Sequence, residues 1–183
     1  MNSQEVVTLY QAGKRNFSQA DLPKVKLIFV RLNGANFSGA NLHMANLRGA
    51  DLRGVDLRGA DLTGANLRNA DLTAANLEGA NLSHSSLSGA NLTRAKLKRA
   101  NLEKSILTDA NLSQTNLKFA NLRQSKLIGT ILTGAILLGT NLNEASLLGA
   151  NLTEASLVDT NLHEANLTDA TMPNGKVYIE ILA

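Results

Sequence analysis

The residues best suited to catalysis or metal binding in this chain are its three histidines, His43, His84 and His163. An imidazole can act as a general base, and several converging imidazoles can bind zinc. These three are separated by 41 and 79 residues, and the chain contains no cysteine to complete a metal site. Serines flank His84, but neighbours on one extended segment do not form a catalytic triad. We therefore expect solvated histidines, no catalytic, metal or cofactor site, and no enzymatic activity.

Basic residues are the second group that could bind a ligand. Residues 1 to 130 carry 17 Lys and Arg against 9 Asp and Glu, a balance of +8, whereas residues 131 to 183 carry 1 against 6, a balance of −5. Such residues can bind phosphate groups, but no aromatic residues interleave for base stacking and carboxylates share the stretch. We expect a solvated face rather than a nucleic-acid site. The candidate basic patch comprises Arg48, Arg53, Arg58, Arg68, Arg94, Lys96, Lys98 and Arg99.

Composition excludes several classes of protein. The absence of cysteine excludes a disulfide scaffold and a cysteine nucleophile. Mean hydropathy is −0.07 and no apolar run is long enough to span a bilayer, so no transmembrane helix is expected. No secretory signal is visible at the N-terminus, which makes the cytoplasm the expected location.

A five-residue repeat dominates the sequence and must position any site. From Phe17 to Met172 every fifth residue is large and apolar, over 32 consecutive positions without an insertion. We call this large apolar residue the centre of its repeat. The residue two positions before the centre is alanine in 21 of 31 cases, and the residue one position before it is Asn or Asp in 21 of 32 cases. The unit is A-(N/D)-L-x-x, as in Ala40-Asn41-Leu42.

Neither an α-helix nor a straight β-strand can bury all the large apolar residues of this repeat together. Five residues advance an α-helix by about 500°, which spreads the leucines around its surface. In a straight strand, an odd spacing sends successive leucines to opposite faces. A chain that bends once per repeat can direct every alanine and leucine inward and stack them in successive coils. The sequence therefore predicts a coil of short β-bridges alternating with turns.

Glycine placement supports a turn in each repeat. Twelve of the 14 glycines lie two residues after the centre, where a type II turn needs positive φ. Other repeats place bulkier residues there, such as Asn69 and Phe119, so we expect a mixture of turn types.

Seven inward positions carry hydroxyls that should donate hydrogen bonds to nearby carbonyls: Ser85, Ser105, Thr115, Ser125, Thr130, Thr140 and Thr160.

The tandem units, as in ANLRGADLRGVDLRGADLTGANL at residues 45 to 67, resemble the pentapeptide-repeat proteins. The resemblance covers residues 15–174 and implies an all-β fold, a right-handed quadrilateral parallel β-helix with four repeats per coil. The 32 units would then make about eight coils. Plain arrays of this kind are abundant in cyanobacteria and mostly lack an assigned activity.

The two ends of an open β-helix need covering, because exposed strand edges invite aggregation. Residues 3 to 12 are predicted to form a short amphipathic helix, with Asn2 and Glu5 spaced as a capping box and Gly13 at its end. At the other end, a turn at Pro173 leads to residues 177–182, predicted as a strand that closes the last coil or as an edge for a second chain. We expect three units: a helical cap (1–14), the repeats (15–174) and a C-terminal tail or closing strand (175–183).

Outward apolar residues concentrated between positions 119 and 158 indicate a contact surface. With 20 residues per coil, Leu138 would stack on Val158, and Ile128 on Leu148. A homodimer through this C-terminal half is the simplest form of such an interface. The candidate interaction surface comprises Phe119, Ile128, Ile136, Leu138, Leu148 and Val158.

Three functional hypotheses follow. The first is a non-enzymatic structural or protein-interaction module whose protein partner is unknown. The second comes from the resemblance: some family members mimic DNA and thereby modulate DNA gyrase and confer fluoroquinolone resistance. The basic N-terminal part and the lack of insertions disfavour this mechanism, which requires an acidic surface. The third is binding of a polyanion, either nucleic acid or an anionic membrane surface, through the basic N-terminal half.

Overall fold

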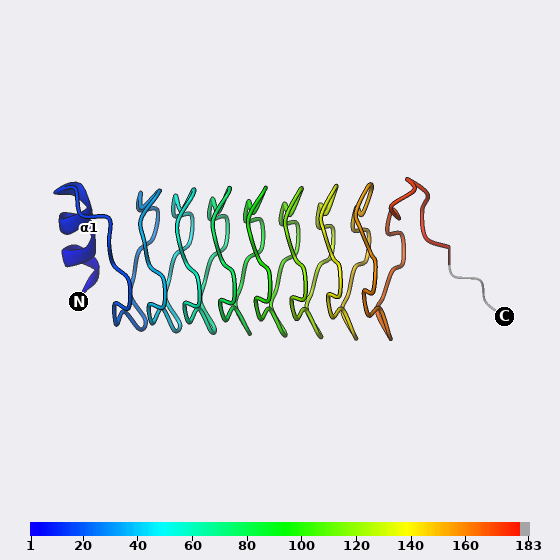
Figure 1. Cartoon of the computed structure of the whole chain (residues 1–183), viewed down its shortest axis with the longest axis horizontal. Coiled ribbons are helices and arrows are strands. Elements are labelled where there is room, and N and C mark those ends of the chain that lie inside the picture. Colours follow the sequence, from blue (N-terminus) through cyan, green and yellow to red (C-terminus); the bar gives the residue numbers. More distant parts are fainter. Residues whose placement is uncertain (180–183) are drawn as a thin grey trace.

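The computed structural model describes residues 1–179 as a stack of regular coils along one axis, with a helix at the N-terminal end (Figure 1). Every fifth residue from Asn16 to Asn151 forms a parallel β-bridge with the residue 20 positions later. Four repeats therefore complete one coil, and each coil has four bridge segments separated by four turns. Each bridge is a single residue, and no longer strand occurs within residues 1–179. The chain is thus a four-sided β-helix.

The interior is filled by the repeat's alanines and leucines. The central leucines from Leu22 to Leu152 are almost completely buried, as are the alanines that precede them by two positions from Ala35 onward. At the N-terminal end of the column the rings of Phe17 and Phe37 stack, with centroids 5.0 Å apart. Because each coil repeats the same inward residues, the side chains form one continuous hydrophobic core.

The inward hydroxyl groups are satisfied by main-chain carbonyls, as predicted. Five of them donate to the carbonyl of the preceding central leucine, as Ser85 Oγ does to Leu82 O at 2.6 Å. Thr140 Oγ1 instead reaches Leu117 O in the adjacent coil, and Thr160 Oγ1 bonds the carbonyl of Leu137 in the same way. These residues therefore replace alanine in the core without leaving a buried polar atom unpaired.

The Asn or Asp before each centre stabilises the turn that follows. Its side-chain Oδ1 accepts the backbone N–H of the residue two positions later, as in Ser38 N to Asn36 Oδ1 at 2.9 Å. The turn then closes with a bond from Ala40 N to Phe37 O at 3.0 Å. The preference for Asn and Asp thus follows from a local hydrogen bond that favours the turn, although repeats with Lys or Ile at this position form the same turn.

The expected mixture of turn types is wrong. At the second position after each centre, from Gln19 to Asp169, φ is positive whether the residue is glycine or not. The backbone N–H of this residue donates to the next coil in both cases, from Gly39 N to Arg58 O at 2.8 Å and from Arg99 N to Lys118 O at 3.0 Å. Positive φ at residues as different as Gly39, Arg99 and Asp169 shows one turn conformation for every residue type, including Asp169, beyond which residues 1–179 form no further coil.

The uniform turn makes glycine favourable at positions where another residue now stands. Ala74 has φ of 58°, so Ala74→Gly should raise the free energy of unfolding by about 1 kcal/mol, because it relieves the strain of a left-handed alanine. Gly59→Ala should lower it by about 1 kcal/mol, although an added Cβ there has no atom within 4 Å. Urea denaturation measures both changes. A loss of stability in Ala74→Gly would contradict this account of the turn.

The N-terminal end is covered by helix α1, Ser3–Gln11. The predicted capping box is present: Asn2 Oδ1 accepts Glu5 N, and Glu5 Oε2 accepts Asn2 N. Val6 is completely buried against the core, and Tyr10 Oη donates to Asn33 O at 2.8 Å. The helix therefore packs on the first coil. Within residues 1–179, no helix is long and apolar enough to cross a membrane.

The C-terminal end is closed only in part by the described residues. The predicted turn forms, with Gly175 N donating to Met172 O at 2.8 Å. Val177 then pairs antiparallel with Thr171, and Tyr178 N donates to Ala170 O. Of the strand predicted over residues 177–182, positions 180–182 lie outside the described residues. Leu157 and Leu162, in the last coil, are less buried than the leucines of the inner coils.

Candidate functional site

The 20-residue coil sorts the outward side chains into four sides, because residues 20 apart lie above one another. We name each side by the residues it carries. The Phe119 side contains residues 116–119 and their equivalents in other coils, and the asparagine side contains residues 121–124. The Leu148 side contains residues 146–149, and the threonine side contains residues 91–94. The Phe119 and Leu148 sides are half a coil apart and therefore face in opposite directions.

The six apolar candidates fall on two of these sides. Phe119, Ile136, Leu138 and Val158 lie together on the Phe119 side. Backbone bonds join their coils, from Phe119 N to Leu138 O at 2.9 Å and from Gly139 N to Val158 O at 3.0 Å. Ile128 and Leu148 stack on the opposite side, joined by the bond from Gly129 N to Leu148 O at 2.9 Å. The structure therefore brings four of the six together and separates them from the other two.

The Phe119 side presents these four side chains as a continuous apolar row. Phe119 is 53% exposed, Val158 58% and Ile136 37%. The Phe119 ring lies over Gly139, where an added Cβ would come within 2.6 Å of its Cδ1 atom. Because Gly139 has no side chain, the Phe119 ring has room to pack against the next coil. The four apolar side chains therefore lie on one side of three successive coils, with Lys118 and Asp159 beside them.

The candidate basic patch is spread over three sides. Arg48 and Arg68 stack on the Leu148 side, and Arg53 and Arg94 belong to the threonine side. The rest lie on the Phe119 side: Arg58, Lys96, Lys98 and Arg99. There Lys98 Nζ is 3.6 Å from Glu78 Oε1. The coil therefore does not gather these residues into one patch, but it places Lys96, Lys98 and Arg99 one coil before Phe119.

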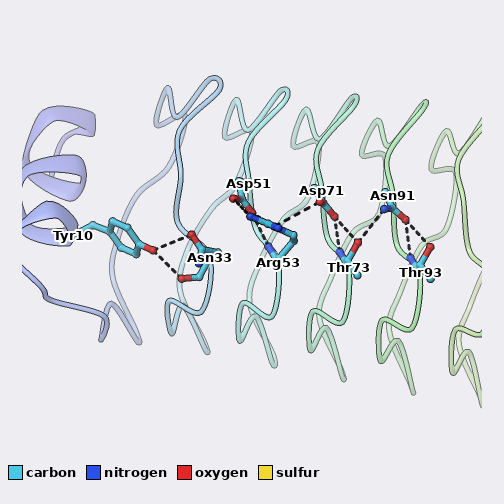
Figure 2. Close-up of polar contacts among 8 residues, drawn as sticks. All are labelled: Tyr10, Asn33, Asp51, Arg53, Asp71, Thr73, Asn91 and Thr93. Atoms are coloured by element: carbon cyan, nitrogen blue, oxygen red, sulfur yellow. Dashed lines mark hydrogen bonds and ion pairs between the residues drawn. The ribbon is translucent and has the colours of Figure 1, made fainter.

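Several of the arginines are already paired with carboxylates. Arg53 Nε donates to Asp51 Oδ1 at 2.8 Å and also lies 3.7 Å from Asp71 Oδ2 (Figure 2). The hydrogen bond from Arg53 lowers the pKa of Asp51, and the bond from Arg58 lowers the pKa of Asp56 in the same way. These local pairs reduce the positive charge that the N-terminal coils offer to a polyanion.

A ladder of amides occupies the asparagine side and was not anticipated from the sequence. Asn121 Nδ2 donates to Asn101 Oδ1 at 3.1 Å, and Asn141 Nδ2 donates to Asn121 Oδ1 at 3.3 Å. Beside the ladder, hydrogen bonds from Gln124 and Arg123 lower the pKa of Glu144. The signal in the sequence was an Asn or Asp at every twentieth position. Since these groups bond to one another, the side is polar and internally paired.

The histidines are as widely separated as predicted. His43 and His163 stand six coils apart on the asparagine side, about 29 Å at the usual spacing of stacked strands, with His84 between them. His163 Nε2 is 3.4 Å from Glu164 Oε1, and both side chains are exposed. Among residues 1–179, no three His, Cys, Asp or Glu side chains are grouped so that they could hold a metal ion.

Comparison with known proteins identifies the repeat. The family model described as pentapeptide repeats matches residues 16–54, 50–89, 70–109, 95–134, 105–143 and 135–174. We find no match to the chain among curated proteins.

Several solved structures are similar to the chain. HetL from Nostoc sp. strain PCC 7120, a protein involved in heterocyst differentiation regulation, is 35% identical over 97% of this chain and 100% of its own, with a TM-score of 0.34. Rfr23 from Cyanothece 51142 is 32% identical over 61% of this chain and 86% of its own, with a TM-score of 0.43. QnrB1, a plasmid-mediated fluoroquinolone resistance protein, is 17% identical over 84% of this chain and 89% of its own; its TM-score of 0.51 indicates a shared fold alone.

Proposed function

Because the chain belongs to the pentapeptide-repeat family and folds as a right-handed β-helix, we propose that it is a non-enzymatic module that binds a protein partner along its Phe119 side. The observation that carries the proposal is the apolar row formed by the exposed Phe119, Ile136 and Val158 together with the partly buried Leu138. Scattered exposed aliphatic residues are normal, but a continuous row on one side of a rigid scaffold is typical of an interaction surface.

The surroundings of the row match the anatomy of a protein interface. Such interfaces have an apolar centre and a polar rim, and aromatic residues are enriched in the centre. Here the rim at one end is basic, with Lys96, Arg99 and Lys118 on the same side, whereas Asp159 lies at the other end. This arrangement favours a partner that is acidic where it meets residues 96–118.

A second copy of the chain is the simplest such partner. A two-fold axis at Leu138 would place Lys118 of each copy opposite Asp159 of the other, and the two apolar rows would pack together. This arrangement pairs opposite charges at each end of the apolar row, as a two-fold interface allows.

A pair of matched double variants tests the proposal. Leu138→Asp with Val158→Asp places two charges on the Phe119 side, and Ile128→Asp with Leu148→Asp places them on the opposite side of the corresponding coils. Light scattering should show a wild-type dimer, which the first variant converts to a monomer and the second leaves intact. If the wild type is monomeric, the wild type and the two variants are each used for affinity capture. The wild type and the second variant should then retain bound partner proteins, and the first variant should not. Equal capture by all three would contradict the proposal.

A further inference from the structure

A cavity of about 520 Å³ lies between helix α1 and the first coil, far from the Phe119 row. Its volume is within the range usual for sites that bind small molecules. Val7 and Val30 supply apolar surface, Tyr10 and Phe29 supply aromatic rings, and Arg15 and Arg31 supply guanidinium groups. The site therefore combines apolar, aromatic and cationic groups within one hollow.

Two of these side chains are held in place by the protein itself. The Arg15 guanidinium lies 3.9 Å from the centre of the Tyr10 ring, and its NH1 group donates to Tyr10 O at 2.8 Å and Lys14 O at 3.1 Å. Tyr10 Oη in turn donates to Asn33 O (Figure 2). The ring and the cation are thus positioned before any ligand arrives, which reduces the entropy lost on binding.

Phe29 supplies a second, more accessible ring. It is 68% exposed although it is one of only four phenylalanines in the chain. Its backbone has φ of 55°, and the ring rests over Gly49 with the Arg48 guanidinium 5.7 Å from its centre. The glycine and the arginine fix the ring against the second coil, so that a planar ligand in the cavity can stack on it.

The charge of the cavity selects an anion. Its lining contains two guanidinium groups and no carboxylate. Asp51 is near enough for Arg31 to help lower its pKa, but the hydrogen bonds of this carboxylate go to Arg53. Guanidinium groups bind carboxylate and phosphate groups in bidentate fashion. The Arg31 side chain makes no hydrogen bond or ion pair with residues 1–179, so within this part of the chain its donors are available for such a ligand.

We propose that this cavity binds a small anion that carries a planar aromatic ring, of about the size of a nucleoside monophosphate. Arg15 and Arg31 bind the phosphate or carboxylate group, and the ring of the ligand stacks on Phe29. The proposal does not depend on the function of the Phe119 side.

Isothermal titration calorimetry on the full chain tests this proposal. The probes are adenosine 5′-monophosphate, with adenosine and inorganic phosphate as its separate halves, and benzoate, with benzyl alcohol and acetate as its halves. The two anions distinguish a phosphate from a carboxylate ligand. At least one aromatic anion should bind 10-fold or more tightly than either half. Binding of neither aromatic anion, or binding no tighter than that of a half, would overturn the proposal.

Variants locate the binding in the cavity. Arg31→Gln and Phe29→Ser change exposed side chains, so the coil should keep its circular dichroism spectrum, and each should weaken binding 10-fold or more. Arg68→Gln, an exposed arginine outside the cavity, should leave the affinity unchanged. If Arg31→Gln and Phe29→Ser bind as the wild type does, the ligand binds elsewhere and the proposal fails.

Discussion

Leu82→Ala should lower the free energy of unfolding by about 3–5 kcal/mol. Leu82 is completely buried, with Leu62 and Leu102 at equivalent positions in the adjoining coils. The backbone bond from Leu82 N to Asn101 O, at 2.6 Å, holds the coils at a fixed spacing, so the core cannot collapse into the space left by the deleted atoms. Because each coil contacts only its neighbours, the defect also weakens the link between the two halves of the stack.

Leu162→Ala is the matched control for this prediction. Leu162 occupies the same column in the last coil, where the described residues bury it only partly. The same substitution should cost about 1 kcal/mol there, because little buried contact is lost. Urea denaturation followed by circular dichroism compares the two variants. Equal losses would mean that burial within the column does not determine stability.

Deleting residues 121–125 should leave the fold intact and weaken binding through the Phe119 side about 100-fold. The deletion joins Ala120 to Lys126 and Leu127, which preserves the repeat pattern. Because it removes one quarter of a coil, residues after the junction turn by one side, and Phe119 no longer lies in line with Ile136 and Val158. Loss of a central aromatic anchor from an interface costs about 2–3 kcal/mol, so affinity should fall roughly 100-fold.

Deleting residues 61–65 provides the control for the rotation. It also removes one repeat and joins Ala60 to Asn66 and Leu67, but the surface from residue 96 to residue 158 stays in one register. Binding or dimerisation should therefore be retained, as measured by calorimetry or light scattering. If both deletions bind like the wild type, the partner does not use the Phe119 side. If both lose binding, the interface also includes the N-terminal coils.

Features that depend on a few neighbouring residues were predictable from the sequence. The capping box of Asn2 and Glu5, the burial of the repeated leucines and the carbonyl bonds of hydroxyls such as Ser85 all form as expected. The turn conformation was predicted wrongly at residues such as Arg99 and Phe119. Both residues have positive φ and donate their backbone N–H to the next coil, a contact that local propensity does not include.

The sequence by itself determined which side chains point inward, because the five-residue period allows only a chain that bends once per repeat to bury every leucine. The sequence left open which outward residues are neighbours in space. All repeats are alike, and nothing within one five-residue repeat defines how many repeats make a coil. Bridges between residues 20 apart decide this. They place Leu138 and Val158 on one side and Ile128 and Leu148 on the other. The packing of helix α1 on the first coil in turn places Tyr10, Arg15 and Phe29 around one cavity. Closure of the coil is a long-range property, because it depends on hydrogen bonds between segments that are distant in the chain.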